Sequence, residues 1–365
     1  MITNLKIKNF KSLKNVELEL KNLNLFMGLN GMGKSSVIQS LLVLKQSRDL
    51  SRGTINLNEW CVQIGRGKDA MYQYNNSDQD IVLELISDNL EPLKWNIHFD
   101  AESQHLETED LYPIQNLINH PLFSTNFQYL KAERSAPQED YKTSSLEVIK
   151  DKQIGIDGYY AIHYLFAYAD DEVIKELWHP KAKSSSLKHQ VDAWLSEVSP
   201  GIKLNTDEIK GTEKILLDIQ FETGTGYTNS FKPKNVGFGI TYVLPVIIAL
   251  LTAKKDRLIV IENPESHIHP RGQAELGRLM ALSASVGAQL LIETHSDHIL
   301  NGIRVGVKQG CVANKDVNIF YLEKLTTSTE QFTKATTIKV DKNGELSEYP
   351  KNMLDEWSNQ LFKLM

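Results

Sequence analysis

The 365-residue sequence predicts an α/β fold, and three observations support that prediction. A glycine-rich loop, Gly28–Ser36, lies between a short apolar run and a segment with helical apolar spacing. Between residues 53 and 100, apolar positions alternate with polar ones, which is typical of β-ribbons. After about residue 238, continuous apolar runs alternate with helical segments, as in a parallel sheet that helices cover on both faces.

The N-terminal elements are expected to be two strands, a short strand and a helix. Period-two alternation predicts strands over 2–10 and 16–20. The apolar run 24–27 then enters the glycine-rich loop, and apolar residues at helical spacing predict a helix over 36–45. The order is therefore strand, glycine-rich loop, helix.

The later elements follow the same two periodicities. Further helices are expected over 158–178, 187–198, about 238–252, 272–283, 297–306 and 353–364. Further strands are expected over 127–130, 202–209, 215–221, 258–261, 289–292, 317–322 and 336–340. We expect a mixed sheet with flanking helices, a β-ribbon subdomain and an inserted helical lobe. The expected segments are 1–99, 100–234, 235–308 and a small strand–helix cap over 309–365.

Composition excludes several classes of protein. The chain has 40 Lys and Arg against 46 Asp and Glu, so a net charge of −6 gives no global attraction to nucleic acid. Two cysteines, Cys61 and Cys311, are too few for a disulfide framework. The start of the chain lacks a signal-peptide layout, and the longest apolar stretch, Val243–Leu251, is about half of a membrane span. We expect a cytoplasmic protein without a membrane segment.

The loop Gly28-x-x-x-x-Gly33-Lys34-Ser35 has the complete pattern of a phosphate-binding loop. Its glycines permit a turn whose backbone N–H groups surround phosphates, its lysine neutralises the β- and γ-phosphates, and its serine hydroxyl ligates Mg²⁺. The N-terminus of the following helix adds a positive partial charge. The residues expected to bind nucleotide here are Asn30, Gly31, Met32, Gly33, Lys34, Ser35 and Ser36.

A second feature fits the same chemistry. The apolar run Leu258–Ile261 reads as a buried strand and ends at Glu262. A lone strand ending in glutamate would usually be a solvated edge. In a chain with a phosphate loop, such an acid instead delivers a carboxylate to Mg²⁺ beside the serine hydroxyl, and Glu262 is the expected metal ligand.

The order of four motifs resembles a known group of ATPases. The motifs are the phosphate loop, the glycine-rich Asn235–Pro245, the acid-ended strand and Glu293-Thr294-His295-Ser296. This order resembles the ABC-type head of the RecF/SMC/OLD group. More narrowly, Glu-Asn-Pro-Glu-x-His-x-His-Pro at 262–270 and a tail with Asn343-Gly344, Tyr349-Pro350 and Asp355-Glu356 look like OLD-like bacterial AAA-family ATPases. Residues 100–230 match only loosely.

The resemblance implies roles for particular residues, with ATP and Mg²⁺ as cofactors. Asn235–Pro245 would be the signature segment, in which Gly237, Gly239 and Thr241 contact the γ-phosphate of ATP held by the other protomer. The alternative is a glycine-capped start of a core helix. His295 would be the histidine that senses the γ-phosphate, or else a structural histidine. A glutamine usually joins Mg²⁺; Gln63 is the candidate, with Gln39 and Gln73 as alternatives.

One position departs from the pattern. ABC-type heads usually place a catalytic glutamate directly after the metal acid, and here that position is Asn263. An amide cannot take a proton from water at neutral pH. The hypothesis is that Glu265 or His295 polarises the attacking water and that ATPase activity is weak.

Two other features have competing interpretations. His267, His269, His295 and His298 suggest zinc, but no cysteine or acid completes a usual ligand spacing. The preferred interpretation is a turn-forming loop, without zinc, after the strand that ends at Glu262. Arg134 follows the expected strand 127–130, where it could face a phosphate or a partner protomer; a surface ion pair is the preferred interpretation.

The predicted function is an ATPase that dimerises around ATP and regulates a separate effector, a nuclease or toxin, in bacterial anti-phage defence. The chain shows neither the heptads of coiled-coil arms nor, after His295, the acidic cluster of a nuclease domain. One alternative is a RecF-like DNA-repair ATPase, for which DNA is the partner. Another is an ATP-gated scaffold with little hydrolysis, which Asn263 favours.

Overall fold

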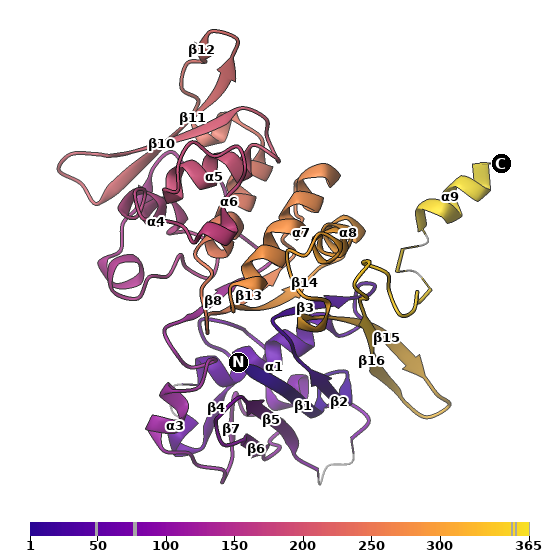
Figure 1. Cartoon of the computed structure of the whole chain (residues 1–365). Coiled ribbons are helices and arrows are strands. Elements are labelled where there is room, and N and C mark those ends of the chain that lie inside the picture. The colour runs from indigo at the N-terminus through magenta and orange to yellow at the C-terminus, as the bar shows by residue number, and fades with distance from the viewer. Residues whose placement is uncertain (48–49, 76–78, 352, 355, 365) are drawn as a thin grey trace. The chain divides into compact units, whose positions relative to one another are not determined.

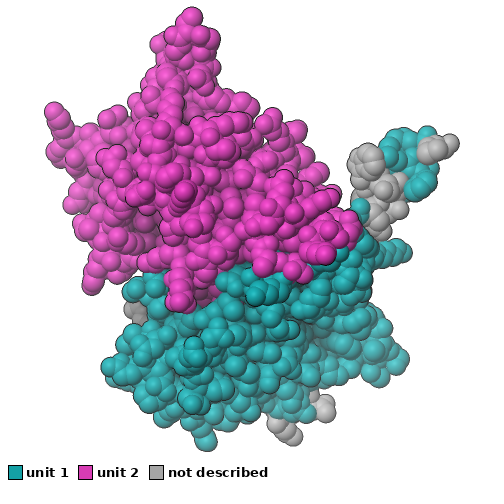
Figure 2. All heavy atoms as spheres, in the orientation of Figure 1, with its two compact units in different colours: residues 1–127, 315–341, 346–365 teal, residues 128–314, 342–345 magenta. Residues whose placement is uncertain are grey.

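The computed structural model describes residues 1–47, 50–75, 79–351, 353–354 and 356–364 and divides the chain into two compact units (Figure 2). Unit 1 comprises residues 1–127, 315–341 and 346–365, and unit 2 comprises residues 128–314 and 342–345. Within the described ranges, no helix has the length and apolar character needed to cross a membrane.

Unit 1 contains an antiparallel sheet with the strand order β2-β1-β5-β6 (Figure 1). Alternate side chains of β5 are buried, as the period-two pattern predicts, and the indole of Trp95 in β6 is fully buried. The strands are β1 (Ile2–Phe10), β2 (Leu13–Glu19), β5 (Ile81–Ser87) and β6 (Leu93–Ile97). The strands expected over 2–10 and 16–20 are confirmed.

A second set of strands in unit 1 positions the glycine-rich loop. β3 (Leu23–Met27) is buried along its whole length and pairs in parallel with β15 (Val317–Thr326). β15 in turn pairs antiparallel with β16 (Gln331–Lys339), so these strands are mixed in direction. The rings of Phe26 and Phe320 stack at 5.4 Å. The C-terminal strands therefore lie against the strand that enters the loop, and α1 (Lys34–Gln46) leaves it.

Smaller elements complete unit 1. A short ribbon joins β4 (Thr54–Asn56) and β7 (His105–Glu107). The helices are α2 (Gly67–Ala70), α3 (Ile114–Ile118) and α9 (Glu356–Leu364). The expected C-terminal helix is confirmed from residue 356, whereas Asp355 lies outside the described residues.

The strands of unit 2 that matter for the site run in the order β14-β13-β8. β13 (Leu258–Glu262) and β14 (Gln289–Glu293) are parallel and in step, so Glu262 and Glu293 are paired at their ends. β8 spans Phe127–Leu130. The helices associated with these strands are α6 (Phe238–Leu251), α7 (Pro270–Ser285) and α8 (Asp297–Lys308). The expected strand–helix alternation is confirmed.

Helices α7 and α8 pack closely because glycines face each other's backbone. A Cβ at Gly277 would lie 2.3 Å from the Ile299 carbonyl oxygen, and one at Gly302 would lie 2.0 Å from that of Ala274. Only glycine permits this approach.

The rest of unit 2 combines a β-hairpin with short helices (Figure 1). β11 pairs antiparallel with β10, β9 and β12. The bounds of these elements are β9 (Tyr141–Lys142), β10 (Ile202–Glu208), β11 (Lys214–Thr223), β12 (Gly226–Tyr227), α4 (Ala161–Ala167), α5 (Leu187–Leu195) and a π-helix at Ser145–Lys150.

The helix expected over 158–178 is wrong in extent. α4 ends at Ala167, and only Lys175–Leu177 forms a further, 3-10 turn. Between them the backbone N–H of Val173 donates to Ser185, and that of Leu187 donates to Asp171. Hydrogen bonds to residues 185–187 thus replace the intrahelical hydrogen bonds of this segment. The apolar spacing of the sequence does not predict such tertiary pairing.

Candidate active site

The glycine-rich loop runs from the end of β3 to the start of α1, as the sequence predicts. Gly28 has φ 139°, and a Cβ there would lie 2.2 Å from the Leu322 carbonyl oxygen in β15. Gly33 has φ 98°, and its Cβ would lie 2.6 Å from the Thr333 hydroxyl. Any side chain would strain the backbone and meet a neighbouring strand, so the loop's path requires both glycines.

A residue from the C-terminal strands supports the loop directly. The Thr333 hydroxyl donates to the Met32 carbonyl oxygen at 3.0 Å and lies 2.8 Å from the Ser12 hydroxyl. The Thr333 backbone N–H also donates to the Ser12 carbonyl oxygen at 2.8 Å. Sequence reasoning missed Thr333, because no local pattern marks a threonine 301 residues from its partner.

The chemistry of the loop fits a phosphate group. α1 begins after Gly33, which offers no side-chain acceptor, and its first turn contains no acidic residue. A helix N-terminus of this kind favours an anion. The buried Lys34 ammonium lies 2.9 Å from the carbonyl oxygens of both Gly28 and Leu29, while Ser35 is exposed. Positive charge and a hydroxyl are therefore gathered at one turn.

The glutamine candidates occupy different parts of unit 1. Gln63 is exposed and forms an isolated bridge with Asn58 in the segment after β4. Gln39 lies on α1, where its side-chain oxygen accepts a hydrogen bond from the Lys11 ammonium at 2.7 Å. Gln73 is exposed. The role of Gln63 as a metal ligand therefore stays a prediction.

Glu262 ends β13 with both carboxylate oxygens engaged inside unit 2. One oxygen accepts from the Tyr129 hydroxyl at 3.1 Å and the other from the Ala132 backbone N–H at 3.2 Å. Burial raises the pKa of the Glu262 carboxyl, and these two donors and the nearby Arg134 charge partly oppose that rise. The expected acid is thus held rigidly at the strand end.

Arg134 is buried, so its interpretation as a surface ion pair is wrong. Its side chain is only 3% exposed, and its guanidinium donates to the carbonyl oxygens of Glu262 at 2.6 Å and Asn263 at 3.2 Å. Burial lowers the pKa of this guanidinium to about 10, a change that the charges of Glu265 and Glu262 oppose. Arg134 remains charged at neutral pH and fixes the backbone where β13 ends.

Replacing Arg134 should therefore destabilise unit 2. In Arg134→Met, two carbonyl groups lose charged donors, and we expect the free energy of unfolding to fall by about 3 kcal/mol. The matched control is Arg66→Met, because Arg66 pairs with Glu102 on an exposed surface and should change stability by less than about 1 kcal/mol. Urea denaturation followed by circular dichroism measures both. Equal stability of the two variants would contradict the anchoring role.

Asn263 occupies an unusual backbone conformation. Its φ is 44°, a left-handed value that asparagine tolerates better than most residues. Its backbone N–H donates to the Glu293 carbonyl oxygen at 2.9 Å. Its side-chain oxygen is buried and has no hydrogen-bond partner among the described atoms. A buried amide thus stands directly after the expected metal acid.

Glu265 connects the two loops that follow β13 and β14. Its carboxylate oxygens accept from the Thr294 hydroxyl at 2.8 Å and from the His295 backbone N–H at 2.7 Å. The His295 side chain is exposed. Glu265 and His295 are thus brought together through a contact to the His295 backbone.

The expected signature segment forms the start of α6. Gly237 is the N-cap, the adjacent Phe238 is 57% exposed, and the Thr241 hydroxyl donates to the Phe238 carbonyl oxygen at 3.1 Å. A Cβ at Gly239 would lie 2.3 Å from the His267 carbonyl oxygen. The glycine thus lets α6 approach the loop after β13.

The histidines of that loop have structural partners. His267 has φ 65° and packs its ring against Tyr242 at 4.8 Å between centroids. The His269 ring nitrogen accepts from the Arg271 backbone N–H at 3.3 Å at the start of α7. In the part of the chain that the structure describes, no three His, Cys, Asp or Glu side chains are grouped to hold a metal ion.

The expected site residues thus form two sets. Residues 30–36 and Gln63 belong to unit 1, whereas Glu262, Asn263, Glu265 and His295 gather at the ends of β13 and β14 in unit 2. Gly237, Gly239 and Thr241 belong to unit 2 as well.

Three family models match the chain. Residues 107–301 match the model described as "AAA domain, putative AbiEii toxin, Type IV TA system". Residues 1–153 match "AAA ATPase domain", and residues 312–364 match "Protein of unknown function (DUF3696)".

Two RecF proteins are similar in sequence to this chain. The DNA replication and repair protein RecF of Francisella tularensis subsp. tularensis (strain WY96-3418) is 24% identical over 256 residues, which cover 65% of this chain and 71% of the relative. The RecF of Francisella tularensis subsp. novicida (strain U112) matches with the same identity and coverage.

Solved structures share the fold. An Smc head bound to the C-terminal winged-helix domain of ScpA aligns with a TM-score of 0.56 at 13% identity, covering 93% of this chain and 98% of the other. The Pyrococcus furiosus Smc head with an extended coiled coil, bound to the C-terminal domain of ScpA, aligns with a TM-score of 0.52 at 12% identity, covering 100% and 99%. These likenesses confirm the predicted fold class, an ABC-type head with a mixed sheet and flanking helices.

Proposed function

We propose, from the premise that the chain belongs to the AAA-domain family matched over residues 107–301 and is an ATPase of the RecF/SMC-like type, that it dimerises around ATP and hydrolyses it slowly. The observation that carries the proposal is the phosphate loop. Lys34, the exposed Ser35 and the acid-free N-terminus of α1 are gathered at one turn whose glycines leave no room for side chains.

In this proposal, individual residues have roles toward Mg²⁺ and the phosphates of ATP. Ser35 and Glu262 are the proposed metal ligands, with Gln63 as a third, and the loop residues 30–36 bind the phosphates. Bound Mg²⁺ would neutralise the charge that develops on the phosphates. The rigid support of Glu262 by Tyr129 and Ala132 suits a ligand that must not move between turnovers.

Slow hydrolysis follows from the residues around Asn263. An amide at this position cannot accept the proton of the attacking water. The Glu265 carboxylate accepts hydrogen bonds from the Thr294 hydroxyl and the His295 backbone N–H, so it holds the loop that carries His295. We therefore propose that Glu265 mainly positions the loop of His295, and that His295 contacts the γ-phosphate.

Glu265→Gln separates positioning from general-base catalysis. The amide oxygen of glutamine can still accept one of the two hydrogen bonds, so we expect ATP turnover to fall by less than about tenfold. Loss of a general base would instead lower turnover by about 100-fold or more. Phosphate release at saturating ATP measures the difference, and a loss of the larger size would assign proton transfer to Glu265.

The start of α6 supports dimerisation. A helix N-terminus preceded by an open glycine can receive an anion from another molecule, and a Cβ placed on Gly237 would meet no heavy atom within 4 Å. Because this segment would complete the site of a second copy, the assembly would be a two-fold dimer.

Gly237→Arg tests this surface, because Gly237 is exposed and its Cβ would meet no heavy atom, whereas Thr241 is buried. The larger side chain should leave ATP affinity of the single chain unchanged but weaken ATP-dependent dimerisation by at least about tenfold, because bulk at the segment excludes the partner's nucleotide. Sedimentation velocity with and without ATP measures the effect. A dimer of ordinary stability would remove the signature role from this segment.

An effector role is the finer part of the proposal. The matched family's description names a "putative AbiEii toxin" of a "Type IV TA system", so the family is associated with toxin–antitoxin systems. We propose that the chain controls a separate nuclease or toxin in anti-phage defence. Co-expression of the chain with its neighbouring gene products, followed by phage challenge, tests this role; equal phage resistance with and without Lys34→Ala would count against it.

A RecF-like role in DNA repair is the second candidate, because the RecF relatives cover 65% of the chain. This role requires DNA binding that weakens steeply with salt. Fluorescence anisotropy with duplex DNA at rising salt concentration separates the two candidates. Measured ATP turnover separates either candidate from a scaffold that does not hydrolyse ATP.

A further inference from the structure

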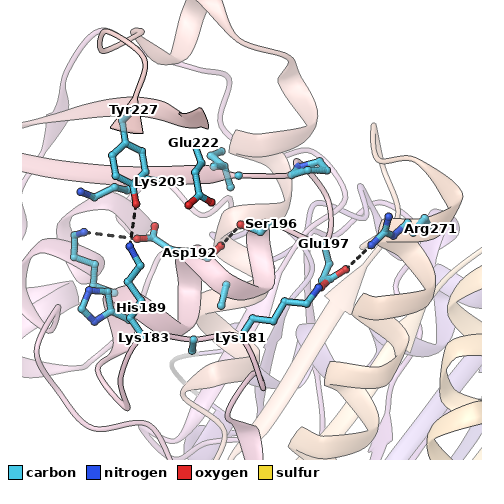
Figure 3. A pocket seen from close by; sticks show the side chains of 16 residues that line it. Lys181, Lys183, His189, Asp192, Ser196, Glu197, Lys203, Glu222, Tyr227 and Arg271 are labelled. Carbon is cyan, nitrogen blue, oxygen red and sulfur yellow. Dashed lines mark hydrogen bonds and ion pairs between the residues drawn. The ribbon is translucent and has the colours of Figure 1, made fainter. Parts of the chain in front are cut away.

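Unit 2 contains a charged pocket that the proposed ATPase function does not use. The pocket has a volume of about 430 Å³ and lies among α5, the β10–β11 hairpin and residues 181–183 (Figure 3). This size is in the range of small-ligand sites. Five cationic side chains line the pocket against three carboxylates: Lys181, Lys183, Lys188, Lys203 and Arg271 against Asp192, Glu197 and Glu222.

Three of these cations have carboxylate partners. Lys181 and Arg271 each lie 3.1 Å from the carboxylate of Glu197, whose side chain is only 9% exposed. Lys188 lies 3.6 Å from Asp192 on the same helix. These three cations share two carboxylates, Glu197 and Asp192, and their ion pairs form part of the pocket wall.

Lys183 and Lys203 differ from the other three cations in their partners. Within the described ranges, neither ammonium has a carboxylate at ion-pair distance; both instead approach Tyr227. The Lys183 ammonium lies 2.9 Å from the Tyr227 hydroxyl, and the Lys203 ammonium lies 4.6 Å from the centre of its ring. Figure 3 shows Tyr227 and both lysines at one side of the pocket. The carboxylates that attract the Lys183 ammonium from farther away are Glu222, which is exposed, and Asp192.

We propose that this pocket binds a small phosphate-bearing anion between Lys183, Lys203 and Tyr227. Two ammonium groups without carboxylate partners and a phenolic hydroxyl supply charge-assisted donors from three different segments. A phosphate carries close to two negative charges and several acceptor oxygens, so it can meet these donors together. The pocket volume admits a small phosphate compound and is too small for a nucleic acid duplex.

Pyrophosphate binding by isothermal titration calorimetry tests the proposal. The full chain carries Lys34→Ala in every sample, which weakens anion binding at the phosphate loop and separates this test from the ATPase proposal. We expect one saturable site, and Lys183→Gln/Lys203→Gln should weaken pyrophosphate binding at least about tenfold. The matched control is Lys175→Gln/Lys210→Gln, because both lysines are exposed and lie outside the pocket; it should bind as tightly as the parent.

Two results would overturn the proposal. One is the lack of saturable pyrophosphate binding, or equal affinity in the pocket variant and its control. The other is binding of a single-stranded oligonucleotide that depends on Lys183 and Lys203 without any pyrophosphate binding, which would assign the surface to nucleic acid. Both variants change exposed or half-exposed lysines, and matching circular dichroism spectra establish that they fold.

Discussion

Lys34→Ala should abolish measurable nucleotide binding by this chain at micromolar ATP. The Lys34 ammonium is held inside the phosphate loop by the carbonyl oxygens of Gly28 and Leu29. It is the charge that would meet the β- and γ-phosphates. Charge-assisted hydrogen bonds contribute roughly 1.5–3 kcal/mol each, so we expect ATP affinity to fall by about 100-fold.

The control for this variant is Lys8→Ala. Lys8 is an exposed lysine of β1 in the same unit, and its loss should leave ATP affinity within about twofold of the parent. Calorimetric titration with ATP and Mg²⁺ measures both variants. If Lys34→Ala bound ATP as tightly as Lys8→Ala, the assignment of Gly28–Ser36 as the phosphate loop would be lost.

Glu262→Gln should separate binding from hydrolysis. Glutamine keeps the size of the side chain but removes the negative charge that the proposed Mg²⁺ site requires. We expect ATP turnover to fall by at least about 100-fold, with ATP affinity reduced by less than about tenfold. The reason is that the phosphate loop supplies most of the binding, whereas the metal acid acts on the reaction.

The matched control for Glu262→Gln is Glu208→Gln, an exposed glutamate at the end of β10 in the same unit. Its turnover should equal that of the parent. Phosphate release at saturating ATP measures the two variants side by side. Turnover of Glu262→Gln close to that of the control would move the metal ligand to another acid.

The sequence predicted the local features well, because their signals lie within a few residues. The phosphate loop needs only the nine residues 28–36 and the alternation around them. The strand that ends at Glu262 is likewise visible in a single apolar run. In each case the pattern and the structure depend on the same short segment.

Contacts between distant segments were not predictable. Arg134 donates to carbonyl groups 128 and 129 residues further along the chain, and carbonyl groups carry no sequence signal. The hydrogen bond from the Thr333 hydroxyl to the Met32 carbonyl oxygen likewise joins residues 301 positions apart. The helix expected over 158–178 failed for a related reason, because residues near 171–173 pair with 185–187 and end the helical ladder.

ATP-dependent dimerisation of Glu262→Gln tests the central claim most directly, because this variant should hold ATP without consuming it. Sedimentation velocity in the presence of Mg²⁺ gives the mass in solution with and without ATP. We predict the mass of one chain without ATP and of two chains with saturating ATP. We also predict that adding Gly237→Arg returns the mass with ATP to that of one chain. A mass of one chain at an ATP concentration that saturates binding would contradict the claim that this protein dimerises around ATP.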